Sequence, residues 1–392
     1  MQREEKASIA GHGSIAHPKI HTQFQPILLK GHERSITTVK YNADGDLIFT
    51  ASKDTHPTVW YAESGERLGT FNHHKGAVWD IDCSWDSQYL LTACADAQAR
   101  LFEATTGKFL ARMPHDGPVR VVSWSEGTQF FATANDYFKA TESSKISIFD
   151  FPPENVLNSI TEINQSNSEA FASAAPLHAP KHEIKIDSLC KTTSLAWTLG
   201  NLELIVSICN TSDDNPVLIK YDVEYGKEVV RSTERLRRRD IHSKRINNIS
   251  FNNDKTLMIT ASADTTSKLI DPTTLEVIKT YQSPVPVNGC AISPTHPHVL
   301  IGGGQDTSKV TTSAASAGNF ECKFFHMIYN EEFARIPGHF GPINSVAVHP
   351  FGKSFATGSE DGFVRLHHFD LGYLTTPTYF PEGVENILIS KD

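Results

Sequence analysis

The sequence lacks the features that identify secreted, disulfide-bonded or membrane-spanning proteins. Its six cysteines are scattered over 392 residues without a Cys-x-x-Cys pair, which is typical of buried, reduced thiols. No stretch approaches about 18 consecutive apolar residues, and the segment MQREEKASIAGHG has no apolar signal core. These absences predict a cytoplasmic protein that makes no membrane contact.

Positive charge and catalytic motifs are scarce as well. The 36 Lys and Arg against 45 Asp and Glu give a net charge of −9, which argues against a nucleic-acid binder over its whole surface. No Gly-x-Ser-x-Gly elbow occurs, and the run Gly302–Gly304 lacks the spacings that bind phosphate and predicts a tight turn. The histidines His12, His17 and His21 have no cysteine partners, so a solvated tail is a better interpretation than a metal site. We expect no catalytic residue, no metal and no cofactor.

What the chain does contain is a repeat of histidine and aspartate. Five histidines are followed 22 residues later, once 21, by an aspartate: His32–Asp54, His74–Asp96, His115–Asp136, His242–Asp264 and His339–Asp361. The first three histidines are 42 and 41 residues apart. A period of about 40–45 residues with strand-like runs between turn residues predicts propeller blades of four strands each.

The strand-like runs add up to seven blades. We therefore predict an all-β, seven-bladed β-propeller over residues 26–371, with a flexible extension at 1–25, a mobile insert at about 158–180 and a tail at 372–392. An eighth blade within 151–185 is disfavoured because this stretch lacks strand character. The seventh blade needs a fourth strand, and the N-terminal run PILLKG is available to supply it, which would close the ring and protect its last edge.

The repeated polar residues invite two interpretations. A set such as His32, Ser52 and Asp54 resembles a catalytic triad, but catalysis needs one activated site and this set recurs from blade to blade. We therefore predict a structural network in each blade, in which the aspartate accepts from the histidine. The histidine donates onward to a Ser or Thr and, in blade one, toward Trp60. Removing one member would leave a buried polar group unpaired, at a cost of about 1–3 kcal/mol.

The densest charged feature is a basic cluster before the fifth blade. It contains Arg237, Arg238, Arg239, Lys244 and Arg245. A solvated loop is the plainer interpretation, since acidic residues lie nearby. A contact with RNA or an acidic partner is the alternative.

Several segments are not generic for propellers. Together with PILLKGHERSITTVKYNADGDLIFTASKD, the segments VWYAESGERLGTF, LIGGGQD and GHFGPINSVAVHPFGKSFATGSEDGFVRLHHFD make the chain similar to one WD-repeat family. This family is the I subunit of eukaryotic translation initiation factor 3, and the resemblance runs from about residue 26 to 371. The extension at 1–25, the insert at 158–180, the arginines Arg237–Arg239 and the C-terminal tail depart from the family pattern.

The resemblance implies a non-enzymatic scaffold subunit of a complex that binds the small ribosomal subunit. It further implies that the propeller clasps a C-terminal helical segment of the B subunit and associates with the G subunit. The family's acidic contacts for the B subunit correspond here to Asp254 and Asp271. Direct contact with RNA stays open. A WD-repeat signalling adaptor that docks a receptor kinase or a phosphoprotein is the alternative function.

Overall fold

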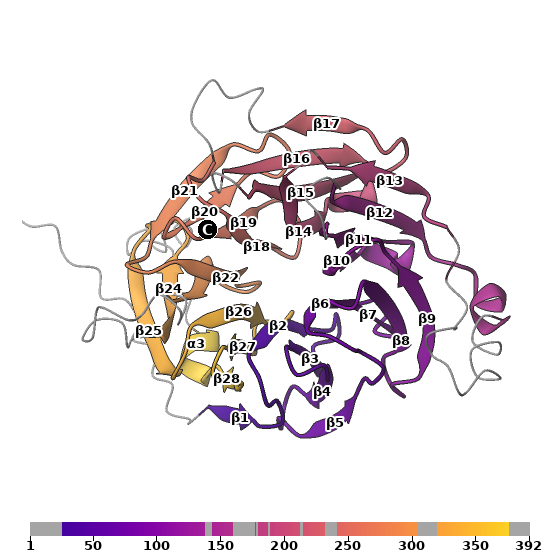
Figure 1. Cartoon of the computed structure of the whole chain (residues 1–392). Coiled ribbons are helices and arrows are strands. Elements are labelled where there is room, and N and C mark those ends of the chain that lie inside the picture. Colours follow the sequence, from indigo (N-terminus) through magenta and orange to yellow (C-terminus); the bar gives the residue numbers. More distant parts are fainter. Residues whose placement is uncertain are drawn as a thin grey trace, which may run out of the picture.

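The chain folds into seven antiparallel sheets of four strands, which stand radially around a central channel (Figure 1). The computed structural model describes residues 26–137, 143–159, 177, 179–186, 189–211, 215–231, 241–304 and 320–375. The predicted seven-bladed propeller is therefore confirmed. The extension at 1–25, most of the insert at 158–180 and the tail beyond 375 lie outside the described residues.

Each blade runs outward from the channel in chain order. The first three blades are β2 (Ile36–Tyr41), β3 (Leu47–Ser52), β4 (Thr58–Tyr61) and β5 (Arg67–Thr70); β6 (Val78–Cys83), β7 (Tyr89–Cys94), β8 (Gln98–Glu103) and β9 (Phe109–Pro114); and β10 (Val119–Trp124), β11 (Phe130–Asn135), β12 (Lys145–Asp150) and β13 (His182–Lys185). The next two are β14 (Cys190–Trp197), β15 (Glu203–Asn210), β16 (Pro216–Asp222) and β17 (Glu228–Arg231); and β18 (Ile246–Phe251), β19 (Met258–Ser262), β20 (Thr266–Ile270) and β21 (Val277–Gln282). The last two are β22 (Val287–Ile292), β23 (His298–Gly303), β24 (Phe320–His326) and β25 (Glu332–His339); and β26 (Ile343–Val348), β27 (Ser354–Ser359) and β28 (Val364–His368), which β1 (Ile27–Leu29) completes.

The hydrophobic core is divided among the blade junctions. Seven clusters of buried apolar side chains occur, and each joins two neighbouring blades. The cluster between the first two blades, for example, packs Phe49 and Phe71 of one sheet against Phe102 of the next. This division explains the strand sequences, because a strand between two neighbours is apolar on both faces.

The first strand closes the ring, as predicted. β1 pairs antiparallel with β28 in the register Leu28↔Arg365, and the Leu29 side chain is 1% exposed. Leu29 belongs to the cluster that joins the first and last blades. Residues at the two ends of the propeller thus share one sheet, which leaves the ring without an open junction.

The third blade contains a strand that the sequence did not reveal. β13 follows the long insert yet pairs with β12 as the outer strand of the same sheet, in the register Ile146↔Ile184. The residues beyond the insert therefore complete a blade and do not begin a new one.

Every inner strand carries a β-bulge near its start, after the first residue in six blades and after the third residue in β14. The register shifts occur at Ile36/Thr38, Val78/Asp80, Val119/Val121, Thr192/Ser194, Ile246/Asn248, Val287/Gly289 and Ile343/Ser345. A bulge changes the direction of the extra side chain. The extra residues lie where the inner strands begin, and we call this side of the ring the bulge face.

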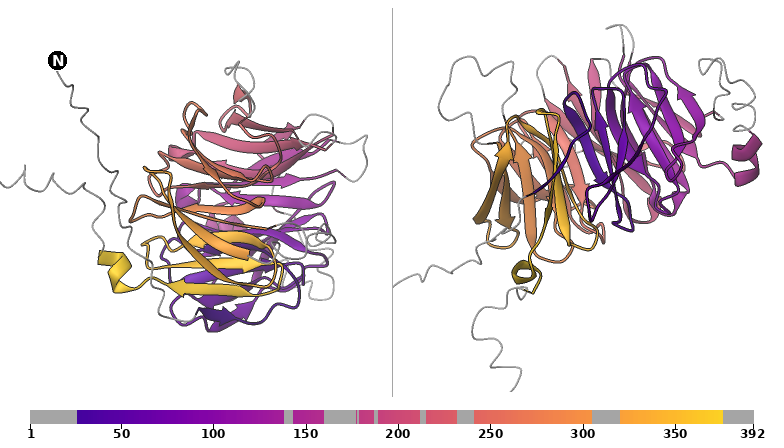
Figure 2. Two further views of the ribbon diagram at one scale, coloured as in Figure 1. Left: turned by 90° about the vertical axis from the view of Figure 1, so that its left-hand side faces the viewer. Right: turned by 90° about the horizontal axis from the view of Figure 1, so that it is seen from below.

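The opposite side of the ring carries the short helix α3 (Leu371–Thr375), and we call it the α3 face (Figure 2). Tyr373 attaches this helix to the turn after β22, since its hydroxyl lies 2.9 Å from His298 Nδ1 and its ring packs on His296. Inner strands end at the α3 face, so the turns between first and second strands, and between third and fourth strands, lie there.

Candidate functional sites

The repeated histidine and aspartate lie on the bulge face and contact each other within a blade. In blade one, His32 Nδ1 lies 2.7 Å from Asp54 Oδ2, and His32 Nε2 lies 2.7 Å from Thr50 Oγ1. Trp60 Nε1 donates to the same Thr50 oxygen at 2.9 Å. The His32 side chain is fully buried. Although burial raises the pKa of Asp54, hydrogen bonds from His32 and from backbone N–H groups hold it below its usual value.

Blades five and seven repeat this geometry. The Nδ1–Oδ2 distances are 2.9 and 3.0 Å and the Nε2–Oγ1 distance is 2.8 Å in both, for His242–Asp264–Thr260 and His339–Asp361–Thr357. In both blades the bonded histidine lowers the pKa of the aspartate despite its burial. A polar network that satisfies its members fixes the loops to the strands.

The Ser or Thr expected beside the histidine is Thr50 in blade one, and Ser52 has other partners. Ser52 Oγ instead donates to the Arg34 carbonyl at 3.1 Å and accepts from the Asp54 amide at 3.2 Å. The residue that meets the histidine is a threonine 18 positions after it. This spacing holds in all five repeats, at Thr50, Thr92, Thr133, Thr260 and Thr357, so the signal was present in the sequence.

Blade two departs from the predicted pairing. Arg100 donates to both carboxylate oxygens of Asp96, at 3.0 and 2.6 Å, while His74 Nε2 lies 2.9 Å from Thr92. Within the described residues, no hydrogen bond joins His74 to Asp96. Burial and the nearby Arg100 lower the pKa of His74 to about 3. A guanidinium forms two parallel bonds with a carboxylate and so replaces the imidazole as the donor.

Blade three departs in the same way. Arg120 Nε donates to Asp136 Oδ2 at 2.8 Å, and Lys191 of the next blade lies 3.7 Å from the same oxygen. His115 contacts Thr133 at 3.2 Å, and no hydrogen bond between described atoms joins it to Asp136. Burial lowers the pKa of His115 to about 4. The predicted His–Asp pair is thus replaced here by a salt bridge to Arg120 of the same blade and a longer one to Lys191 of the next blade.

The two aspartates expected to bind a partner lie together on the α3 face of blade five. Asp254 is in the β18–β19 turn and Asp271 directly follows β20. The register aligns Met258 with both Phe251 and Ile270, so the two turns leave the sheet from one row. The Asp254 side chain is exposed.

Asp271 has a local function that Asp254 lacks. Its carboxylate accepts from the Thr273 amide at 2.7 Å and from the Thr274 hydroxyl at 3.2 Å, which shapes the β20–β21 turn. These bonds hold the pKa of Asp271 below its usual value despite partial burial. The ionised carboxylate remains partly exposed, on the same face of the blade as Asp254.

An apolar strip continues from this acidic pair toward blade six. It consists of Val277, Ile278, Ile328 and Tyr329, which are 40%, 49%, 58% and 39% exposed. Lys279 Nζ donates to the Ile328 carbonyl, and the Tyr281 hydroxyl donates to the Met327 carbonyl at 3.2 Å, so the two blades meet along the strip. Exposed apolar side chains grouped beside charged ones are typical of a protein-binding surface.

Only part of the basic cluster lies within the described residues. Arg237, Arg238 and Arg239 lie outside them. Lys244 and Arg245 are exposed and precede β18, so they lie on the bulge face, away from Asp254 and Asp271.

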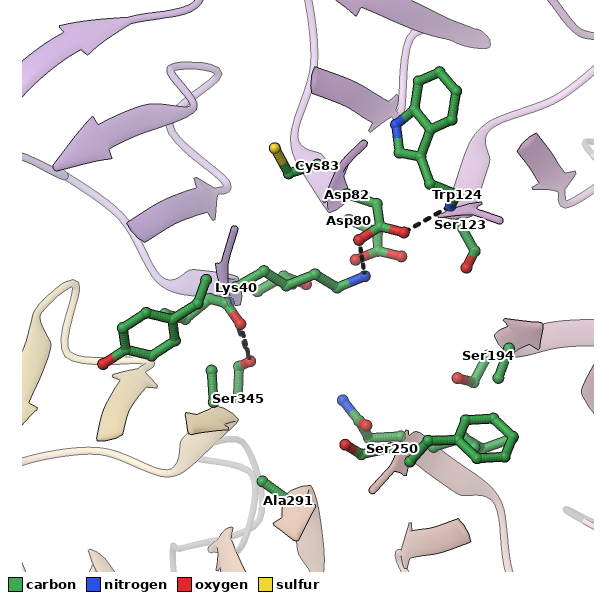
Figure 3. Close-up of a pocket in the computed structure, with 18 of the residues that line it drawn as sticks. Lys40, Asp80, Asp82, Cys83, Ser123, Trp124, Ser194, Ser250, Ala291 and Ser345 are labelled. Atoms are coloured by element: carbon green, nitrogen blue, oxygen red, sulfur yellow. Dashed lines mark hydrogen bonds and ion pairs between the residues drawn. The ribbon is translucent and has the colours of Figure 1, made fainter. Parts of the chain in front are cut away.

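The central channel contains a cavity of about 540 Å³, whose lining runs along the inner strands from the bulge face to the turns of the α3 face. Lys40, Asp80 and Asp82 meet in it (Figure 3). Lys40 donates to Asp82 at 3.0 Å, and Asp82 accepts from the Trp124 amide at 2.7 Å. Asp80 accepts from the Val122 amide at 3.2 Å. These groups join blades one, two and three and are occupied by structural bonds.

The buried carboxyl of this cluster has an altered pKa. Burial raises the pKa of Asp80 to about 6, and the adjacent Asp82 adds to this while Lys40 opposes it.

Within the described part of the chain, no group of three or more His, Cys, Asp and Glu side chains could hold a metal ion. The described helices include none that is long and apolar enough to cross a bilayer.

The part of the chain that matches known proteins is nearly the same as the propeller. The family model EIF3I matches residues 24–378. The chain belongs to this family. It is 42% identical to eukaryotic translation initiation factor 3 subunit I of Drosophila melanogaster over 349 residues, and 42% identical to the human subunit I over 350 residues. Each match covers 89% of this chain and 98% of the relative. The cattle subunit I is 41% identical over 350 residues. The resemblance seen in the sequence is thereby confirmed.

Proposed function

We propose that the chain is a non-catalytic scaffold subunit of the eukaryotic translation initiation factor 3 complex. In this function the propeller binds the B subunit, associates with the G subunit and supports assembly of the small-ribosomal-subunit preinitiation complex in the cytoplasm. The proposal is supported by relatives named as subunit I of this factor, which align along 89% of the chain. It is also supported by the channel, whose charged groups are used to join blades.

The surface that carries the proposal is the rim of blade five. The exposed Asp254 and the partly exposed Asp271 provide negative charge. The apolar strip of Val277, Ile278, Ile328 and Tyr329 provides apolar area. A helix with one apolar face and a basic end would match both parts. Its apolar face would cover the strip, and its cations would pair with the two carboxylates, which mainly increases specificity and the association rate.

The test is binding of the purified full chain to the B subunit in variants of the acidic pair. Asp254→Lys should weaken binding by at least about tenfold, because a cation would then face the basic end of the helix. Asp271→Asn should weaken it less, since the amide oxygen keeps the turn bond to Thr273 while the charge is lost. Ile328→Ser should also weaken binding by removing apolar contact.

The matched control is Glu103→Gln in blade two. Glu103 lies at the end of the third strand, as Asp271 does in blade five, and accepts from the Thr106 hydroxyl, so its substitution removes a turn charge on a blade that is not adjacent to the proposed interface. It should leave binding unchanged. Undiminished binding by Asp254→Lys, with an unchanged melting temperature in all variants, would place the B-subunit interface elsewhere on the propeller.

A further inference from the structure

The bulge face contains a second candidate site, at the mouth of the channel. The mouth is a cavity of about 570 Å³ on the side opposite Asp254 and Asp271. Its wall includes the extra residue of each of the seven inner-strand bulges. These are Thr37, Trp79, Arg120, Thr193, Asn247, Asn288 and Asn344.

Four of these seven residues join each blade to the next. Their side chains donate to a backbone carbonyl at the start of the following inner strand, at 2.7 to 3.1 Å: Thr37 to Val78, Asn247 to Val287, Asn288 to Ile343 and Asn344 to Ile36. These residues form a continuous arc of short polar side chains over blades five, six, seven and one.

Blade four departs from this pattern, because Thr193 donates to Ser207 of its own blade at 3.0 Å. The second and third blades depart further. Trp79 and Arg120 replace the short polar residue, and the Arg120 guanidinium lies 4.2 Å from the centre of the Trp79 ring. Lys53 Nζ lies 6.0 Å from the centre of the same ring. Cation–π attraction holds both cations at this ring, so positive charge and an aromatic surface occur together at the mouth.

Cations outnumber carboxylates at this mouth, although the whole chain has a net charge of −9. Four cationic side chains line it, Lys53, Arg120, Lys191 and Arg245, against two carboxylates, Asp136 and Glu360. Asp136 is 5% exposed and is already paired with Arg120 and Lys191. Lys53 and Arg245 make no salt bridge to any carboxylate of the described residues.

We propose that the channel mouth on the bulge face binds an acidic peptide segment of a partner protein. Lys53 and Arg245 supply positive charge that no described carboxylate neutralises, although Arg245 Nε donates to Asn247 Oδ1 at 2.9 Å. Trp79 supplies an aromatic surface for the peptide chain. Carboxylates and asparagine oxygens in the same wall can accept from peptide N–H groups. RNA fits less well, because its phosphates provide only acceptors, whereas a peptide backbone also offers N–H donors to the oxygens of this wall.

The test uses the full chain and a fluorescein-labelled octapeptide of alternating Asp and Gly, followed by fluorescence anisotropy at low ionic strength. A matched Asn-Gly octapeptide and an octanucleotide of uridine are the comparison probes. We expect saturable binding of the acidic peptide that weakens as salt is added, and no binding of the Asn-Gly peptide. Stronger binding of the oligonucleotide than of the peptide would overturn the proposal.

The deciding variant is the double substitution Lys53→Glu with Arg245→Glu. It should weaken peptide binding by about tenfold or more. The control, Lys108→Glu with Lys227→Glu, makes the same change in net charge at exposed turns on the α3 face. It should leave the affinity unchanged. Equal losses in the two double variants would show that only net charge attracts the peptide, and would refute a site at the mouth.

This site is independent of the B-subunit interface proposed above, because the two lie on opposite faces of the ring. Lys53→Glu with Arg245→Glu should retain binding of the B subunit, and Asp254→Lys should retain binding of the acidic peptide. Failure of one proposal is therefore distinguishable from failure of the other.

Discussion

His32 and Asp54, which are 22 residues apart in the chain, are joined by a hydrogen bond of 2.7 Å in the first blade. The same ring reaches Thr50 through its other nitrogen, and Thr50 accepts from Trp60. The loop before the inner strand, the second strand and the third strand are thereby connected through one buried histidine.

Asp54→Ala should lower the free energy of unfolding by about 1–3 kcal/mol, because it leaves His32 and the backbone amides of residues 33 and 56 without their acceptor. Thermal and chemical denaturation would measure this loss. The control is Glu33→Ala, which removes an exposed carboxylate from the same loop. An unchanged melting curve for Asp54→Ala would contradict a structural function of the network.

Thr50→Val should cost about as much as Asp54→Ala, about 1–3 kcal/mol, since both His32 and Trp60 lose their partner while the volume is kept. Thr50→Ser keeps the hydroxyl and should cost less. Denaturation of both variants beside Ser52→Ala distinguishes the two hydroxyls. A larger loss for Ser52→Ala than for Thr50→Val would contradict the assignment of the histidine's main hydroxyl contact to Thr50.

The raised pKa of Asp80 predicts a dependence of stability on pH. A carboxyl whose folded pKa is about 6, against 3.8 in the unfolded chain, contributes stability below about pH 4 that is lost as the pH rises through 6. Asp80→Asn should therefore stabilise the protein at pH 7.5 relative to wild type, and by less at pH 5. Urea denaturation at the two pH values would measure the difference.

Asp82→Asn is the matched control for Asp80. It should destabilise the protein at both pH values, because Asp82 is the acceptor for Lys40 and for the Trp124 amide. Equal destabilisation by the two substitutions at pH 7.5 would contradict the assignment of the raised pKa to Asp80.

Leu29→Ala should destabilise the propeller by about 2–5 kcal/mol, although Leu29 lies in a strand of only three residues. Its side chain is buried where the first and last blades meet, so the substitution leaves a cavity at the closure of the ring. Leu28→Ala, in the same strand with a less buried side chain, should cost less. Equal costs would indicate that pairing of β1 with β28 matters and packing does not.

The repeat made the architecture predictable, because a fixed spacing of histidine and aspartate marks every regular blade. The closing strand was predictable as well, since the last blade was one strand short. β13 was not, because a long insert separates it from β12 and its four residues have little apolar periodicity.

The functional surfaces were less predictable, for geometric reasons. Arg100 and Arg120 displace two histidines from their aspartates, and side-chain type alone does not show which donor reaches a carboxylate. Lys40 and Asp82 lie 42 residues apart, about one repeat, so their contact between equivalent strands could have been inferred. The channel mouth could not, because it depends on bulges that turn single residues aside.

The most direct test of the scaffold function is affinity purification of the tagged full chain from cell lysate at moderate salt, followed by mass spectrometry. Wild type should recover the other subunits of translation initiation factor 3 together with proteins of the small ribosomal subunit, and Asp254→Lys should lose the B subunit. Recovery of a receptor kinase or a phosphoprotein, without any translation factor, would contradict the scaffold function and favour a signalling adaptor.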